Sequence, residues 1–129
     1  MKFRLKNNDS GQSIIEVLIA LSLVVIVAVG LIKVTTNSIK NSGFARDQRI
    51  ATKYAQEGLE NARKLKEEDS NAFWQKTGTE TEIIGQFTRA ITYFLNADSD
   101  SMQINILVTW QDSQGAHQSS LETSLTKWK

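Results

Sequence analysis

The stretch GQSIIEVLIALSLVVIVAVGLIKV, Gly11–Val34, decides the fold, because it is almost continuously apolar and carries one acid, Glu16, near its start. Within it, Ile14 to Ile32 gives 19 residues that are apolar, small or hydroxylic except for Glu16. At about 1.5 Å rise per residue, a helix of this length spans roughly 28 Å, close to the hydrocarbon thickness of a bilayer. The stretch therefore predicts a membrane-spanning helix.

The polar residues before the run favour one orientation in the membrane. Lys2, Arg4 and Lys6 precede the run and few cations follow it directly, which places the N-terminus in the cytoplasm and the remainder outside. A secretory signal peptide would have a shorter apolar core and a small-residue cleavage site, and no such site follows the run. A plain signal anchor fits in length but leaves Glu16 unexplained, unless its side chain reaches water at the membrane surface.

The residues around the acid carry a more specific pattern. The segment Gly11-Gln12-Ser13-Ile14-Ile15-Glu16-Val17-Leu18 resembles the processing site of type IV prepilins and pseudopilins. In that family a membrane peptidase cuts after the Gly and methylates the new amino terminus. The resemblance implies a leader peptide of residues 1–11, a cut between Gly11 and Gln12, and a methylated Gln12. It assigns residues 12–34 to a transmembrane helix that later forms the filament core, with Ile14, Ile15, Val17, Leu18 and Leu21 among its assembly residues.

The same resemblance gives Glu16 a physical role as the fifth residue of the mature chain. After cleavage, Gln12 would carry a positive α-amine in apolar surroundings, and a carboxylate from an adjacent subunit would neutralise it. An unpaired charge in a medium of low dielectric constant is costly, so both groups gain from the pairing. We therefore expect Glu16 to set the axial register between subunits.

The helix is expected to continue beyond the membrane over residues 35–66. The chain contains no proline, which permits a long uninterrupted helix from about Ser13 to Lys66. Apolar and small residues recur there at helical spacing and form one stripe: Ala51, Tyr54, Ala55, Gly58, Leu59, Ala62 and Leu65. Residues 35–43 include several poor helix formers, so two helices joined near Asn41-Ser42-Gly43 are an open alternative.

The C-terminal half, residues 67–129, is expected to form a small antiparallel β domain. EEDSN (67–71) ends the helix, Phe73-Trp74 is a short aromatic anchor, and KTGTETE (76–82) is read as a loop. Three strands follow with alternating apolar residues: Phe87, Ile91, Tyr93 and Leu95, then Met102, Ile104, Ile106, Val108 and Trp110, then Leu121 and Leu125. This meander needs a cover on its apolar face, and the helical stripe supplies one, which predicts an α+β fold.

This half is also similar to a subset of the same family. FTRAI, ILVTWQDSQG and SLETSLTKW resemble the minor pilin V type and the I-type minor pseudopilin of type II secretion. The resemblance implies a pilin-like fold and a structural, non-enzymatic subunit of a type IV filament, with a place in a priming tip complex. Its implied partners are other pilin or pseudopilin subunits, prepilin peptidase and the cytoplasmic membrane. The resemblance also implies that the mature protein becomes part of a cell-surface or periplasmic filament.

Composition excludes several other classes of protein. The chain has 129 residues, no cysteine and a formal charge of +1, which exclude a disulfide framework, cysteine-ligated metals and a general basic excess. His117 is the only histidine and is expected to be a solvated surface side chain without catalytic or metal-binding neighbours. No nucleophile motif or phosphate-binding loop is present, so we expect no cofactor, metal or small-molecule substrate.

Several alternatives remain open at this stage. Asp98 and Asp100 could ligate Ca²⁺, although a hairpin turn explains them equally, and Trp128 could face a neighbouring subunit. The protein could be a monomeric, signal-anchored adhesin or sensor. It could also be a competence-filament subunit that contacts DNA through a basic strip on the helix. The residues of this strip are Arg46, Arg49, Lys53, Arg63, Lys64 and Lys66. Glutamates interspersed among them dilute the positive charge, so we do not expect nucleic acid to be a partner. Secretion, adhesion, motility and DNA uptake are not distinguished by these residues.

Overall fold

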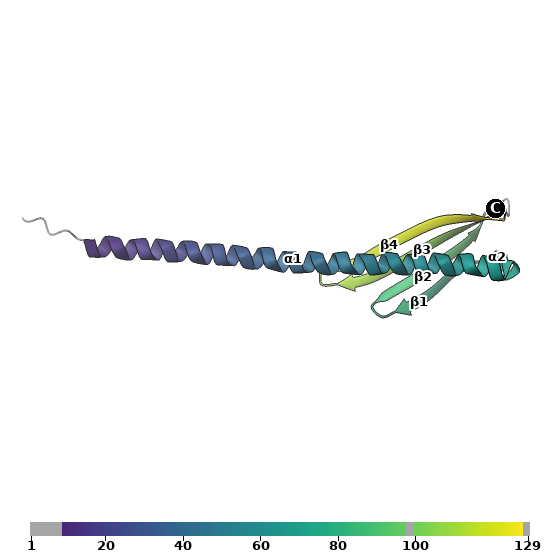
Figure 1. Ribbon diagram of the computed structural model, residues 1–129, viewed down its shortest axis with the longest axis horizontal. Coiled ribbons are helices and arrows are strands. Elements are labelled where there is room, and N and C mark those ends of the chain that lie inside the picture. The colour runs from purple at the N-terminus through teal and green to yellow at the C-terminus, as the bar shows by residue number, and fades with distance from the viewer. Residues whose placement is uncertain (1–8, 98–99, 128–129) are drawn as a thin grey trace, which may run out of the picture. The chain divides into compact units, whose positions relative to one another are not determined.

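The computed structural model describes residues 9–97 and 100–127, with side chains from Ser13 onward. In this part of the chain the elements are α1 (Asp9–Glu68), α2 (Ser70–Gln75), β1 (Gly78–Ile84), β2 (Phe87–Leu95), β3 (Ser101–Asp112) and β4 (Gly115–Thr126) (Figure 1). The chain divides into two compact units, Met1–Ile39 and Lys40–Lys129, and α1 contributes residues to both.

In the first unit, every described side chain is exposed. Some hydroxyl groups of this unit are satisfied inside the helix: the Ser22 hydroxyl donates to the carbonyl of Leu18 at 2.7 Å, and that of Thr35 to the carbonyl of Leu31 at 2.9 Å. Among the described residues, α1 is the one helix long and apolar enough to cross a membrane. The apolar face of this unit therefore has no partner in the described part of the chain.

The helix is continuous through the segment where a break was considered. Residues 41–43 are helical, so the alternative of two helices joined at Asn41-Ser42-Gly43 is wrong. The helix ends at Glu68, two residues beyond the expected end. The short helix α2, which sequence reasoning missed, begins next, and the Asp69 carboxylate caps it by accepting a hydrogen bond from the Ala72 N–H at 3.0 Å. Phe73 of α2 is fully buried.

The sheet has four strands rather than the three that were expected. Their order is β1-β2-β3-β4, and each strand pairs antiparallel with the next. The segment read as a loop, residues 76–82, contributes most of β1, so that expectation is wrong. β1 lies at the edge of the sheet with its side chains almost all exposed, and it therefore lacks the apolar alternation that identifies buried strands.

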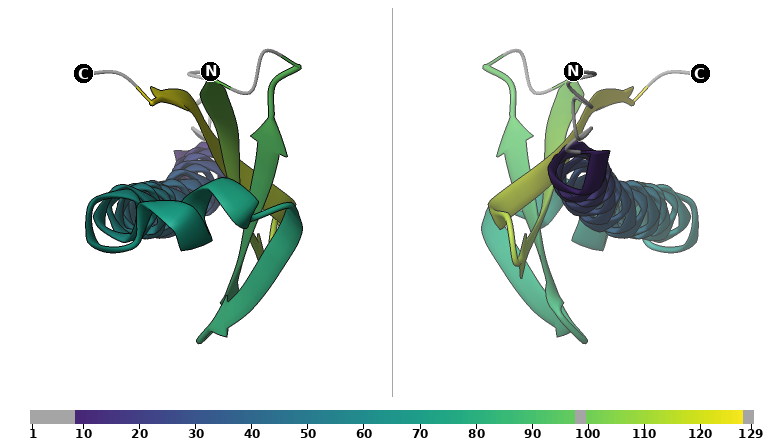
Figure 2. Two further views of the ribbon diagram at one scale, coloured as in Figure 1. Left: turned by 90° about the vertical axis from the view of Figure 1, so that its right-hand side faces the viewer. Right: turned by 90° about the vertical axis from the view of Figure 1, so that its left-hand side faces the viewer.

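The core of the second unit lies between α1 and one face of the sheet, and α2 lies on the same side (Figure 2). The predicted helical stripe and the predicted alternation in β2 and β3 meet here; the buried core residues are Ala51, Ala55, Leu59, Ala62, Phe73, Phe87, Tyr93, Met102, Ile104, Ile106, Val108 and Trp110. A Cβ atom at Gly58 would lie 3.2 Å from the Ile91 Cδ1 and 3.5 Å from the Ile106 Cγ2 atom, so the helix approaches the sheet closely at this glycine. The α+β prediction is confirmed.

One charged residue belongs to this core without having been predicted there. Arg89 of β2 is 7% exposed and faces the helix between Phe87 and Ile91. Its guanidinium donates to the main-chain carbonyl of Tyr54 in α1 at 3.0 Å and to the carboxylate of Glu82 in β1. Arg89 thus joins the helix to two strands, because a buried cation needs such partners.

Candidate functional site

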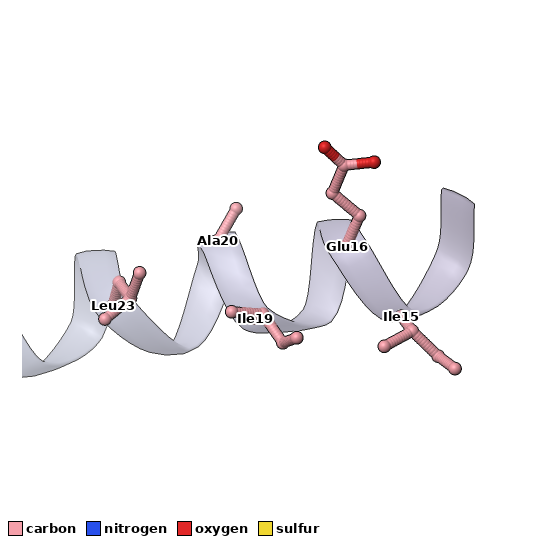
Figure 3. Close-up of a pocket in the computed structure, with 5 residues that line it drawn as sticks. All are labelled: Ile15, Glu16, Ile19, Ala20 and Leu23. Atoms are coloured by element: carbon pink, nitrogen blue, oxygen red, sulfur yellow. The ribbon is translucent and has the colours of Figure 1, made fainter. Parts of the chain in front are cut away.

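The site predicted around Glu16 is a shallow groove on a single helix. The groove is lined by Ile15, Glu16, Ile19, Ala20 and Leu23. Figure 3 shows Glu16 and Ala20 projecting from one side of the helix and Ile15 from the other, with the carboxylate extending away from the backbone. No described residue forms a hydrogen bond or ion pair with Glu16, which is exposed. The carboxylate is therefore free to meet a charge from outside the described chain.

The groove continues along the helix beyond Leu23. The next section is lined by Leu23, Val24, Val27, Ala28 and Leu31. Both sections lie between two rows of side chains spaced four residues apart. The row of large residues is Ile15, Ile19, Leu23, Val27 and Leu31, and the row with smaller members is Glu16, Ala20, Val24 and Ala28. Grooves between such rows are the surfaces into which the side-chain ridges of another helix pack.

The other predicted site residues fall on the same exposed segment or outside the described side chains. The predicted assembly residues are between 57% and 63% exposed: Ile14, Ile15, Val17, Leu18 and Leu21. Gly11 and Gln12 lie in α1, but their side chains are outside the described set, as are residues 1–8 of the predicted leader. The geometry of the predicted cleavage point is therefore not described by the structure.

A comparison with known families agrees with this reading of the N-terminus. The described residues combine a helix long and apolar enough to cross a membrane with an α+β unit, an arrangement that is typical of membrane-anchored proteins. Residues 6–32 match the family model described as the prokaryotic N-terminal methylation motif. The match covers Gly11, Gln12 and Glu16 and supports a type IV pilin-like protein that is processed by prepilin peptidase. No curated protein and no solved structure matches the chain.

His117 is more embedded than its sequence context predicted. It is half-buried in β4, with its ring 4.9 Å from that of Phe44 and 5.5 Å from that of Trp110, between ring centroids. Its Nε2 atom lies 2.9 Å from the Asp112 carboxylate. The expectation of a solvated side chain is therefore wrong, because the β3–β4 hairpin places His117 opposite Trp110 in the register. The position of Asp112 and His117 on either side of the predicted turn could have indicated the contact between these two side chains.

The pKa of Asp112 is held below its usual value at this turn. The main cause is the backbone N–H of Gln114, which donates to the carboxylate at 2.7 Å, and the hydrogen bond with His117 adds to it. Among the described residues, no group of three or more His, Asp or Glu side chains is placed to hold a metal ion. Asp98, one of the two acids considered for Ca²⁺, lies outside the described residues, as does Trp128.

The basic strip considered for DNA contact is largely neutralised by neighbouring acids. The Lys53 ammonium lies 3.7 Å from the Glu57 carboxylate, and the Arg63 guanidinium lies 2.8 Å from that of Glu60. Two further cations of the strip, Arg46 and Lys64, also lie within 4 Å of an acid. Positive and negative charges therefore alternate along this surface, so its electrostatic attraction for a polyanion such as DNA is weak.

Proposed function

We propose that the protein is a minor pilin or pseudopilin, a structural subunit of a type IV pilus or of a related secretion filament, with no catalytic reaction of its own. It inserts with its N-terminus in the cytoplasm and crosses the membrane once. Prepilin peptidase then cuts between Gly11 and Gln12 and methylates Gln12. The observation that carries the proposal is the exposed Glu16, the one charge between Ser13 and Ile32, which has no partner among the described residues.

The free energy of a charge in an apolar medium explains why this arrangement favours assembly. In the membrane, Glu16 lies near one end of the apolar run, where its carboxylate can reach the interface at modest cost. In a filament, the same carboxylate would be surrounded by helices and would need a cation. The α-amine of Gln12 from a neighbouring subunit supplies it, and only one axial offset satisfies both charges.

The groove that begins at Glu16 supports the same proposal. It places the acid at the head of a continuous apolar surface that ends at Leu31. A neighbouring helix seated in this groove would bury the large side chains Ile19, Leu23 and Val27 while it brings its own amino terminus toward the acid. Van der Waals packing would then supply the affinity, and the charge pair would supply the register.

The proposed organisation of the chain follows from this mechanism. Residues 1–11 are the leader, residues 12–34 the membrane anchor and filament core, and residues 35–66 the part of the helix that carries the globular domain. Residues 67–129 form the β domain, whose role is to contact other minor subunits in a tip complex that initiates assembly.

The mature N-terminus tests the class of protein directly. We expect mass spectrometry of the native protein to find a chain that begins at N-methylated Gln12. When prepilin peptidase is deleted, or when Gly11 is replaced by Ala, we expect the chain to begin at Met1. A mature chain that retains residues 1–11 in cells with active peptidase would overturn the proposal. It would favour a monomeric, signal-anchored adhesin or sensor instead.

Glu16→Gln tests the assembly role of the charge. The amide has nearly the same shape as the carboxylate but cannot neutralise an amine, so we expect incorporation into filaments to fall about tenfold or more, consistent with the loss of one buried charge pair. Ser22→Ala is the matched control, because the Ser22 hydroxyl is already bonded to the Leu18 carbonyl of its own helix. Immunoblots of sheared filaments against total membrane protein measure the effect. Wild-type incorporation of Glu16→Gln would exclude the charge pair.

A further inference from the structure

The face of the sheet turned away from α1 has an unusual composition. Side chains alternate between the two faces of each strand, and those on this face are mainly Thr, Ser, Asn, Gln and Ala. Glu122 is the one charged residue among the described side chains of β1–β4 that point this way. The two exposed large apolar residues described in the second unit also lie here, with Ile83 77% and Phe94 63% exposed. Large exposed apolar side chains of this kind mark candidate binding surfaces.

A polar groove lies at the end of the sheet where β2 ends and β3 begins. It has a volume of about 590 Å³ and is lined by Asn96, Gln103, Glu122, Thr123 and Ser124. Phe94 lies near the end of β2 and Asn96 directly after that strand. Phe94 is not one of the lining residues, but it is the register partner of Gln103 on β3, which does line the groove. An exposed aromatic residue is therefore a direct neighbour of a groove that is lined with amide, hydroxyl and carboxylate groups.

The polar side chains of the groove are already oriented by one another. The Asn96 Nδ2 atom donates to the Ser101 Oγ at 2.6 Å, and the Gln103 Nε2 atom donates to the Glu122 carboxylate. Each amide keeps a second N–H and a carbonyl oxygen, and the carboxylate keeps further acceptor positions. The groove thus offers both donors and acceptors whose positions are fixed before any ligand arrives, which lowers the entropy cost of binding.

We propose that this groove binds a neutral saccharide. The apolar C–H face of a sugar ring would stack on Phe94, while its hydroxyls would exchange hydrogen bonds with Asn96, Gln103, Glu122 and Ser124. An anionic ligand is disfavoured because the described residues that line the groove include a carboxylate and no cation. A metal ion is disfavoured because Glu122 is the one acid among these described lining residues. A wholly apolar ligand would leave the oriented polar groups without partners.

This proposal goes beyond subunit assembly and does not depend on it. The groove lies within the unit Lys40–Lys129, so a single membrane-anchored chain contains the entire site. The full-length protein in phospholipid nanodiscs is the suitable form, because sugar-based detergents would compete for the groove. The probe is an immobilised panel of neutral and acidic oligosaccharides, followed by titration of the best neutral binder in saturation-transfer NMR.

Phe94→Ala is the decisive variant, and Ile83→Ala is its matched control. We expect Phe94→Ala to weaken binding at least about tenfold, since the stacking platform is lost. Ile83 is even more exposed on the same face, but its register partner Thr88 does not line the groove, whereas Phe94 pairs with the lining residue Gln103, so Ile83→Ala should bind as wild type. Glu122→Gln, which keeps one acceptor, should weaken binding about threefold to tenfold. Circular dichroism checks that each variant is folded.

Three results would overturn the proposal. One is an absence of binding to every neutral oligosaccharide by the folded wild-type protein. Another is equal loss of binding in Phe94→Ala and Ile83→Ala, which would indicate a general apolar protein contact rather than a sugar site. The third is binding restricted to acidic oligosaccharides, which would be inconsistent with the acceptor-rich groove.

Discussion

The two parts of α1 have the same backbone conformation but opposite surroundings. In residues 13–39 every described side chain is exposed, although most are apolar. In residues 40–68 the apolar and small side chains form a narrow stripe, and the sheet covers it. The part over residues 40–68 therefore completes its core within the chain. The other part depends on a membrane or on other chains to cover its apolar surface.

The largest expected effect tests whether the two parts of the molecule differ in this way. An aliphatic side chain is shortened to alanine in each part, and the change in the free energy of unfolding is compared. Ile106 is fully buried under the helix, so Ile106→Ala should lower the free energy of unfolding of the second unit by about 2–5 kcal/mol. Leu23 is exposed in the first unit, so Leu23→Ala should leave that free energy unchanged. Denaturant titration followed by the fluorescence of the buried Trp110 measures both variants. Equal destabilisation by the two variants would contradict the division into two kinds of surface.

A pair of glycines in α1 gives a smaller test of the helix–sheet contact. A Cβ atom added at Gly58 would meet Ile91, Arg89 and Ile106, whereas a Cβ atom added at Gly43 would have nothing within 4 Å. Gly58→Leu should therefore destabilise the second unit by about 1–3 kcal/mol through overpacking. The matched Gly43→Leu should stabilise it by up to about 1 kcal/mol, because leucine favours the helix more than glycine does. If both variants gained stability in thermal unfolding, the close approach at Gly58 would be refuted.

The features that the sequence predicted are those with a long apolar run or a strong period. The continuous apolar run from Ile14 to Ile32 indicates a helix by its length, and the stripe that includes Ala51, Ala55 and Leu59 follows helical spacing. The alternation from Met102 to Trp110 follows strand spacing. Burial of one face imposes these patterns on the sequence, so the main helix, the inner strands and their mutual packing could be predicted from it.

The features that were missed have no such pattern, because their environment is set by residues distant in the sequence. β1 is an exposed edge strand, and its acids pair with cations rather than mark a loop: Glu82 binds Arg89, and Glu80 binds Lys76. Arg89 is buried only because the helix carbonyl of Tyr54 and the carboxylate of Glu82 meet it in space. The predicted site at Glu16 depends on groups outside the described side chains, so its role stays a prediction.

The smallest expected effect concerns the β3–β4 turn, where we expect the stability of the second unit to depend on pH. The pKa of Asp112 is lowered in the folded protein, chiefly by the Gln114 N–H, so its charged form stabilises the fold at neutral pH. This contribution is present above the unfolded pKa of about 4 and is lost as the pH falls through the lower folded value. Asp112→Asn should be less stable than wild type at pH 7, and the difference should vanish in more acidic solution. Asp100→Asn removes an exposed acid as the control, and urea titrations at several pH values compare the three proteins. A constant difference between wild type and Asp112→Asn across the acid range would show that the charge of Asp112 does not contribute.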